Sequence, residues 1–404
     1  MIDESKQTNV VFVHSSFRTG STFVRSCFRR DPRALSFQEV FNENLADMTP
    51  EMIGHFNPGG WHSKHPSMAP YFLEFQSLLW DTGNGVKLYD RSMSYGTFFS
   101  GSELRTEEAA YIGQLIELAH KHDRVPVITC TRSLGRLQAL KNEFGGLHLM
   151  IYRNIFDQWC SYTDQWLKGD SGFIQTIWLA LNGSHGDELA NKIGRVYATE
   201  SRSPTDPKNF LAFCLLHLYL YARAADHASD IVDIDKLAAD DDVRNRIEKL
   251  IKDSSGLAVD FSSAKQTKSF SLVDIGGTEI LRDTLSAFPE IFAIPQTESG
   301  KKLVEEAQET LIMSYENFWR FSGKLANEFS KSLSELETAK GRIAESNALV
   351  PSLRAHIEMQ DETIRSLRAH IAMLDEKNIA LKEQHFSSNA SKPRRNFLSF
   401  LKPR

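Results

Sequence analysis

The sequence is poor in cysteine and lacks any cysteine spacing that would predict a metal site or a disulfide framework. Its 404 residues include four cysteines, and no two of them form a CxxC pair. All four stand in apolar or helical surroundings, which predicts reduced thiols in a cytosolic protein. The hydrophobic content of 41% is enough for a large apolar core, so we expect the fold to depend on packing alone.

Long apolar runs are also missing. The first nine residues are polar and lack the apolar stretch of a signal peptide. The longest apolar run, Phe210 to Ala222, contains a histidine and is shorter than the about 20 residues that span a bilayer. We therefore expect a soluble, cytoplasmic protein. The net charge of −5 provides no overall field for nucleic acid, so a phosphate-rich ligand would need local positive charge.

What the sequence does contain is an alternation of short apolar runs with helical stretches. Strands are predicted at residues 10–13, 86–89, 125–131 and 147–152, with helices after Gly20 and around residues 107–121 and 134–142. From residue 157 to about 250 the pattern is mainly helical, apart from a polar break at residues 201–207. Strands that alternate with helices indicate an α/β domain, a three-layer sandwich around a central parallel sheet.

A small-residue turn follows the first predicted strand and opens a helix. It reads Ser15-Ser16-Phe17-Arg18-Thr19-Gly20-Ser21-Thr22. Unpaired backbone N–H groups at a helix start bind anions, and the glycine allows close approach to the backbone. The hydroxyls and the arginine add further donors, so we interpret this junction as a phosphate site rather than a plain helix cap. It is not a Walker A loop, because the GxxxxGK[ST] pattern is absent.

The segment from Phe17 to Thr22 resembles the 5′-phosphosulfate loop of the sulfotransferase family. A second matching element is the predicted strand that ends at Arg153, followed eight residues later by Ser161. In that family this arginine and serine hold the 3′-phosphate of the donor. The resemblance implies the P-loop-like sulfotransferase fold, with 3′-phosphoadenosine-5′-phosphosulfate as the donor and no metal. Arg18, Thr19, Gly20, Ser21, Thr22, Arg153 and Ser161 are then the expected donor-binding residues.

Sulfuryl transfer needs a base for the acceptor hydroxyl and positive charge for the leaving group. The resemblance implies a glutamate after the first helix as the base, and Glu39 lies in the matching place, twenty-one residues after Arg18. Glu43 is the second candidate, and His62 and His65 come next. Arg18 is the expected catalytic cation. The family relationship suggests a glycan or glycolipid as the acceptor.

The last quarter of the chain has a different pattern. Apolar and a few polar residues recur alternately four and three apart as a heptad seam: Leu353, Ile357, Gln360, Ile364, Leu367, Ile371, Leu374, Asn378 and Leu381. β-branched residues at a positions and leucine at d positions favour a two-stranded parallel coiled coil. We therefore expect a homodimer, while a helix folded back on the rest of the chain is the alternative.

The chain after residue 385 is basic, with five cationic residues around Phe397, Leu398, Phe400 and Leu401. Such a mixture suits an anionic membrane surface at the inner face of the membrane, or a solubilising tail. The expected organisation is a sulfotransferase-like domain over residues 1–325, a coiled coil over 326–385 and a basic tail over 386–404. Two other classes stay open: an oligomeric interaction protein with a non-catalytic nucleotide-binding domain, and a P-loop kinase.

Overall fold

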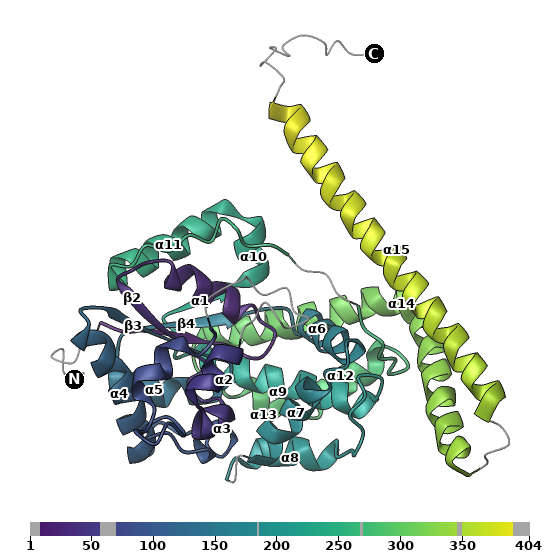
Figure 1. Cartoon of the computed structure of the whole chain (residues 1–404), viewed down its shortest axis with the longest axis horizontal. Coiled ribbons are helices and arrows are strands. Elements are labelled where there is room, and N and C mark those ends of the chain that lie inside the picture. The colour runs from purple at the N-terminus through teal and green to yellow at the C-terminus, as the bar shows by residue number, and fades with distance from the viewer. Residues whose placement is uncertain (1–8, 57–69, 184–185, 267–269, 346–349, 391–404) are drawn as a thin grey trace. The chain divides into compact units, whose positions relative to one another are not determined.

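The computed structural model describes residues 9–56, 70–183, 186–266, 270–345 and 350–390 (Figure 1). The chain forms two compact units, Met1–Ser330 and Lys331–Arg404. The first unit contains a five-stranded sheet with helices packed around it, and the second is helical.

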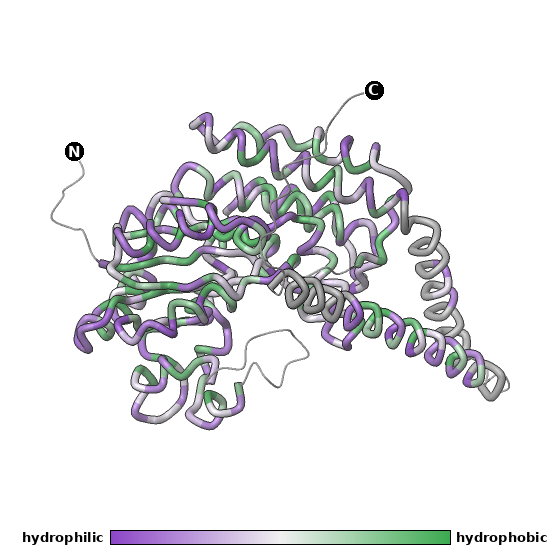
Figure 2. Tube along the Cα trace, turned by 90° about the horizontal axis from the view of Figure 1, so that it is seen from above, coloured by the Kyte–Doolittle hydropathy of each residue, from purple (hydrophilic) through white to green (hydrophobic). Residues whose placement is uncertain are grey.

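The sheet of the first unit is entirely parallel. Its strands lie in the order β2-β3-β1-β4-β5. Their bounds are β1 (Val11–His14), β2 (Ala34–Gln38), β3 (Val125–Cys130), β4 (Leu147–Tyr152) and β5 (Asp230–Asp233). β1 and β4 are buried along their whole length, as expected for strands covered on both faces, and the central strands are mostly hydrophobic in Figure 2.

Alternate residues of the strands pack on opposite faces of the sheet. Val11 and Val13 share one apolar cluster with Val24 of α1 (Ser21–Arg29) and Ile247 of α11 (Asp241–Ser255). Phe12 belongs to a second cluster, with residues of α4 (Thr106–Lys121) and α5 (Leu137–Phe144). The sheet is therefore the middle of three layers, with α1, α10 (Ile234–Ala239) and α11 on one side and α4 and α5 on the other (Figure 1).

A third and larger apolar cluster holds the helical half of this unit together. It contains Trp159 and Phe213, which lie on α6 and α9, and Tyr315 of α14. The remaining helices are α2 (Pro50–His55), α3 (Ser92–Tyr95), α6 (Ile155–Leu167), α7 (Gly172–Gly183), α8 (Glu188–Val196), α9 (Pro207–Ala225), α10 (Ile234–Ala239), α12 (Thr278–Ser286), α13 (Pro289–Phe292), α14 (Glu298–Glu345) and α15 (Val350–Ala390), with short 3₁₀ turns η2 (Glu43–Asp47), η4 (Leu73–Leu78) and η5 (Leu134–Arg136).

One predicted strand is wrong. Residues 86–89 do not join the sheet: Val86 forms an isolated antiparallel bridge to Leu79, and Leu88 has a φ of 62°, which interrupts an extended backbone. The strand at the edge of the sheet beside β3 is instead β2, at Ala34–Gln38. The other predicted strands correspond to β1, β3 and β4.

The predicted seam lies on α15. Of the seam residues whose side chains the structure describes, Leu367, Ile371 and Leu374 are exposed to 49%, 46% and 49%, while others, among them Ile357, Gln360 and Ile364, are partly buried. The structure describes one copy of the chain, so the coiled coil stays a prediction. The basic residues 391–404 lie outside the described part of the chain.

Candidate active site at the carboxyl edge of the sheet

The turn after β1 carries the predicted phosphate loop into α1. Ser15 continues the sheet through a hydrogen bond from its N–H to the carbonyl of Cys130, and Thr19 Oγ1 donates to the carbonyl of Ser16 over 2.8 Å. Arg18 and Gly20 both have left-handed backbones, with φ of 66° and 92°. The turn therefore delivers the first N–H groups of α1 to the carboxyl edge of the sheet, where the helix dipole favours an anion.

Gly20 makes this turn possible for two reasons. Its positive φ is costly for other residues, and a Cβ at this position would lie 3.1 Å from Cγ1 of Ile234, at the start of α10. The loop thus packs directly against the turn that follows β5. Ser21 and Thr22, the next two predicted ligands, lie buried in the first turn of α1.

The two predicted donor-binding motifs meet in space. Ser161 on α6 accepts a hydrogen bond from Nε of Arg18 over 2.9 Å, and Nη1 of Arg153 donates to the carbonyl of Arg18 over 3.0 Å. Gln158, also on α6, links the loop to the end of β4: it accepts a hydrogen bond from Ser16 Oγ and donates one to the Arg153 carbonyl. Two arginines and a hydroxyl therefore converge where β1 and β4, adjacent in the sheet, both end.

A carboxylate that the sequence analysis did not identify lies beside Arg153. Asp235 on α10 places Oδ2 4.0 Å from Nε of Arg153, and its side chain is 29% exposed. Burial raises the pKa of Asp235, while the Arg153 charge lowers it. A phosphate bound by Arg153 would therefore have to compete with this carboxylate.

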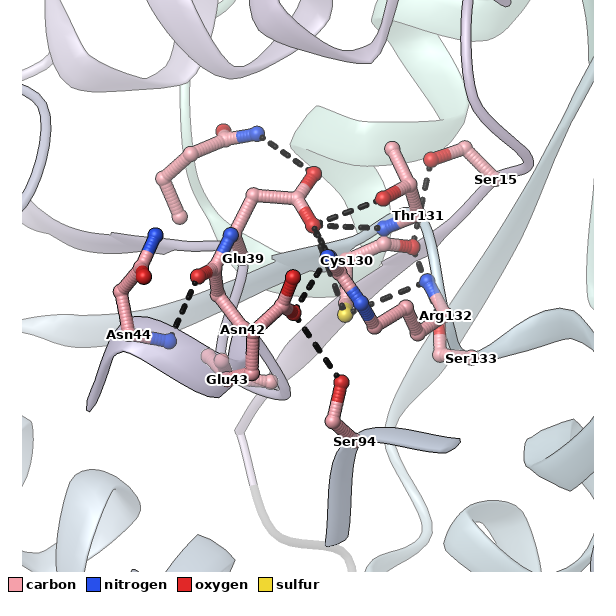
Figure 3. Close-up of polar contacts among 12 residues, drawn as sticks. Ser15, Glu39, Asn42, Glu43, Asn44, Ser94, Cys130, Thr131, Arg132 and Ser133 are labelled. Atoms are coloured by element: carbon pink, nitrogen blue, oxygen red, sulfur yellow. Dashed lines mark hydrogen bonds and ion pairs between the residues drawn. The ribbon is translucent and has the colours of Figure 1, made fainter. Parts of the chain in front are cut away.

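Glu39 lies at the same edge, directly after β2. Its N–H donates to the Thr129 carbonyl over 2.7 Å, which fixes it to β3, and its backbone has a φ of 52°. Oε2 accepts from Oγ1 of Thr131 over 2.7 Å and from Nη1 of Arg132 over 2.8 Å (Figure 3). Burial raises the pKa of the Glu39 carboxyl above its ordinary value, although Arg132 and Thr131 act to lower it.

Arg132, after β3, is the main feature that the sequence analysis missed. Its Nη2 is 2.7 Å from Oε2 of Glu43, so one guanidinium holds both glutamates named as candidate bases (Figure 3). Its Cζ also lies 4.8 Å from the ring centre of Phe17, the residue before Arg18. A signal was present: Thr131 and Arg132 directly follow a strand, and polar residues at strand ends collect at one edge of a parallel sheet.

Some predicted residues lie outside the described part of the chain. His62 and His65, the remaining candidate bases, fall in residues 57–69, which the structure does not describe. Within the described residues, no group of three or more His, Cys, Asp and Glu side chains could hold a metal ion. None of the helices in that part of the chain is long and apolar enough to cross a membrane.

Comparison with known proteins yields little at the level of sequence. No protein-family profile matches the chain, and no curated protein is similar to it. Among solved structures, the chain is similar to the crystal structure of sulfotransferase STF9 from Mycobacterium avium. The two share 11% identity over 71% of this chain and 77% of the other, with a TM-score of 0.31. At so low a similarity, the function has to be inferred from the geometry of the site.

Proposed function

We propose that the protein is a sulfotransferase that moves a sulfuryl group from 3′-phosphoadenosine-5′-phosphosulfate to an acceptor hydroxyl. The observation that carries the proposal is the junction of Arg18, Arg153 and Ser161. Two cations and a hydroxyl at a helix start provide the donors that a ligand with phosphates at both its 5′ and 3′ ends requires.

Each part of the site has a role in this proposal. The amides of the loop and the hydroxyls of Ser21 and Thr22 bind the 5′-phosphosulfate, and Thr19 keeps the loop in shape through its bond to Ser16. Arg153 and Ser161 bind the 3′-phosphate. Because Gly20 packs on Ile234, the loop is held rigidly, which is what a preorganised anion site needs.

The reaction is an in-line displacement at sulfur. The acceptor oxygen forms a bond to sulfur while the bond between sulfur and the bridging phosphate oxygen breaks, and adenosine 3′,5′-bisphosphate leaves with the electron pair. Arg18 and the loop amides stabilise the charge that grows on the bridging oxygen. Glu39 takes the proton of the acceptor hydroxyl, and its raised pKa brings it closer to the pH at which a base is most effective.

The acceptor we favour is a carbohydrate hydroxyl, on a glycan or a glycolipid. This choice extends the family resemblance of the loop and of Glu39 to the substrate. A screen of transfer from donor labelled with ³⁵S to candidate glycans and glycolipids tests it directly.

The decisive experiment for the function is a comparison of nucleotides. Calorimetry with adenosine 3′,5′-bisphosphate and with ATP and Mg²⁺ should give binding of the bisphosphate in preference to ATP. Preference for ATP would favour the kinase. Binding of the bisphosphate without transfer to any acceptor in the screen would favour the non-catalytic interaction protein.

A further inference from the structure

One buried arginine holds two carboxylates of unequal exposure. Arg132 is 4% exposed at its side chain, Glu39 is 6% exposed and Glu43 is 35% exposed. Glu39 is therefore the inner partner of the guanidinium and Glu43 the outer one. Ser94 Oγ also donates to Oε2 of Glu43 over 3.2 Å, which keeps the outer carboxylate in place (Figure 3).

Other buried arginines of this unit are bound differently. Arg136 pairs with the single carboxylate of Glu108 and donates to the backbone carbonyls of Met93 and Ser94. These three partners are all buried. Arg132 instead gives its two terminal nitrogens to two carboxylates. Its Cζ also lies over the ring of Phe17, which belongs to the phosphate loop. This arrangement connects the loop to the base rather than one core element to another.

We infer that Arg132 is the positioning residue for the base Glu39, and that Glu43 is a second partner that compensates the charge of Arg132 when Glu39 takes up a proton. The inference rests on the proposed function, because it assigns these two residues to the proton transfer of that reaction.

The contacts of the two oxygens of Glu39 support the positioning role. Oε2 accepts from Arg132 and from both the hydroxyl and the N–H of Thr131. Oε1 has a longer contact, 3.3 Å from Nε2 of Gln38. Arg132 and Thr131 thus hold Oε2, and Oε1 is the oxygen that would take the proton of the acceptor. Arginine stays protonated in proteins, so the proton remains on Glu39.

There is a physical reason for Arg132 to have Glu43 as a second carboxylate partner. When Glu39 becomes neutral, a buried guanidinium paired with Glu39 alone would lose its counter-charge, and an unpaired buried charge is strongly unfavourable. Oε2 of Glu43 lies 2.7 Å from Nη2, so Arg132 keeps a carboxylate partner both before and after proton transfer. The cost of protonating Glu39 is lowered accordingly.

Among the described residues, the thiol and phenol groups around Glu39 are held in their neutral forms by burial. Burial raises the pKa of the Cys130 thiol, 4.0 Å from Oε2, to about 12. Burial likewise raises the pKa of Tyr95 to about 12, and it raises the pKa of Tyr71 as well. Arg132 and Glu43 are thus the charges that act on Glu39 from the neighbouring β3 end and η2 turn.

Opposite shifts follow from the opposite signs of these two charges. Glu39 is a base only when ionised, so turnover falls as the pH drops through its pKa. Removal of the Arg132 charge, in Arg132→Gln, raises the pKa of Glu39. The acidic limb of the profile of turnover against pH then moves up by about 1–3 pH units. Removal of the Glu43 charge, in Glu43→Gln, lowers that pKa and moves the limb down by about one unit.

The experiment measures this limb in the full-length protein, with Glu107→Gln, an exposed carboxylate on α4, as the control. In parallel, ¹³C NMR of protein labelled at the glutamate carboxyl carbon follows the titration of Glu39 directly, with Glu39→Gln used for its assignment. We expect opposite shifts by both methods and no shift in the control. Arg132→Lys keeps the positive charge but loses the pair of terminal nitrogens that binds two carboxylates at once. The acidic limb should therefore stay near its wild-type pH while turnover falls.

The outcomes separate the inference from the function it rests on. An unchanged Glu39 titration, or shifts of the same sign in Arg132→Gln and Glu43→Gln, would overturn the inference even if transfer is observed. If Arg132→Gln does not fold, Arg132→Lys and Glu43→Gln decide in the same way. Opposite shifts by NMR in a protein that transfers no sulfuryl group would support the roles of Arg132 and Glu43 and overturn the proposed function.

Discussion

Arg18 and Ser161 are 143 residues apart in the sequence and meet through a hydrogen bond of 2.9 Å. The bond joins the loop after β1 to the helix after β4, two strands that are neighbours in the sheet. In an open parallel sheet, ligands bind outside the carboxyl ends of the strands, near the point where the strand order reverses. The contact therefore marks the place where a donor with two phosphate groups would be shared by both segments.

Loss of either arginine should weaken binding of adenosine 3′,5′-bisphosphate. Arg18→Ala and Arg153→Ala each remove a charge-assisted contact, which costs about 1.5–3 kcal/mol, or roughly 10- to 150-fold in Kd. Calorimetry measures the change, with Arg282→Ala, an exposed arginine on α12, as the matched control. Wild-type affinity in both site variants would show that the phosphates are bound elsewhere.

Removal of the Asp235 charge should have the opposite effect. In Asp235→Asn the carboxylate 4.0 Å from Arg153 becomes neutral, so it no longer competes with the 3′-phosphate for that arginine. Two unit charges 4 Å apart interact by about 1 kcal/mol in water and by about 4 kcal/mol near a protein surface, so we expect Kd for the bisphosphate to tighten at least roughly fivefold.

Asp235→Asn also tests which phosphate group of the bisphosphate Arg153 binds. Affinity for adenosine 5′-monophosphate, which has no 3′-phosphate, should change less than affinity for the bisphosphate. Asp253→Asn, an exposed carboxylate on α11, serves as the control. Equal gains for both nucleotides would mean that Asp235 acts on the 5′ side and that Arg153 has been given the wrong phosphate.

Gly20→Ala should destabilise both the fold and the donor site. The left-handed backbone costs about 1–2 kcal/mol for an alanine, and the new Cβ would press on Ile234. Urea unfolding measures the free energy, and calorimetry the affinity. Gly113→Ala is the control, since this helical glycine has open space around it and alanine should be neutral or stabilising there. A fully stable Gly20→Ala protein with normal affinity would contradict the rigid-loop assignment.

The loop and the Arg153–Ser161 element could be proposed from the sequence because their signals are local. A strand, a turn of small residues and a helix start within ten residues predict an anion site before any tertiary contact is known. β1, β3 and β4 were likewise predicted from continuous apolar runs. β2 was missed because Ser36 and Gln38 make its pattern polar, although both are buried in the sheet.

Local patterns alone could not assign Arg132 and Asp235 to the site, although Arg132 directly follows a predicted strand. Each lies after a strand of its own and reaches the site only because that strand has a particular place in the order β2-β3-β1-β4-β5. Strand order is a tertiary property, since it depends on which crossovers pack best and not on the strand's own residues. The pairing of Arg132 with both Glu39 and Glu43 therefore became evident only from the structure.

Glu39→Gln should keep donor binding and lose turnover. The amide preserves the shape of the side chain but cannot accept the proton, so kcat should fall by about 10²- to 10⁴-fold. Bisphosphate affinity by calorimetry should stay within about twofold of wild type, since this residue is not among the expected phosphate ligands. Near-normal turnover would move the role of base to Glu43 or to a histidine.

The seam on α15 predicts a parallel homodimer. Leu367, Ile371 and Leu374 are about half exposed on one helix, and burial of three such side chains against a second copy is worth several kcal/mol. The flanking heptad positions add polar pairs. In a parallel pair the g position His356 faces Asp361 of the second copy, and His370 faces Asp375 in the same way, fourteen residues further on.

Light scattering of the full-length protein measures the dimer, and the double variant Ile364→Asp with Ile371→Asp should dissociate it. Arg365→Asp, at an outward b position of the same helix, is the control and should leave the mass unchanged. A monomeric wild-type protein would refute the coiled coil. An intact dimer of the double variant would place the interface elsewhere on the chain.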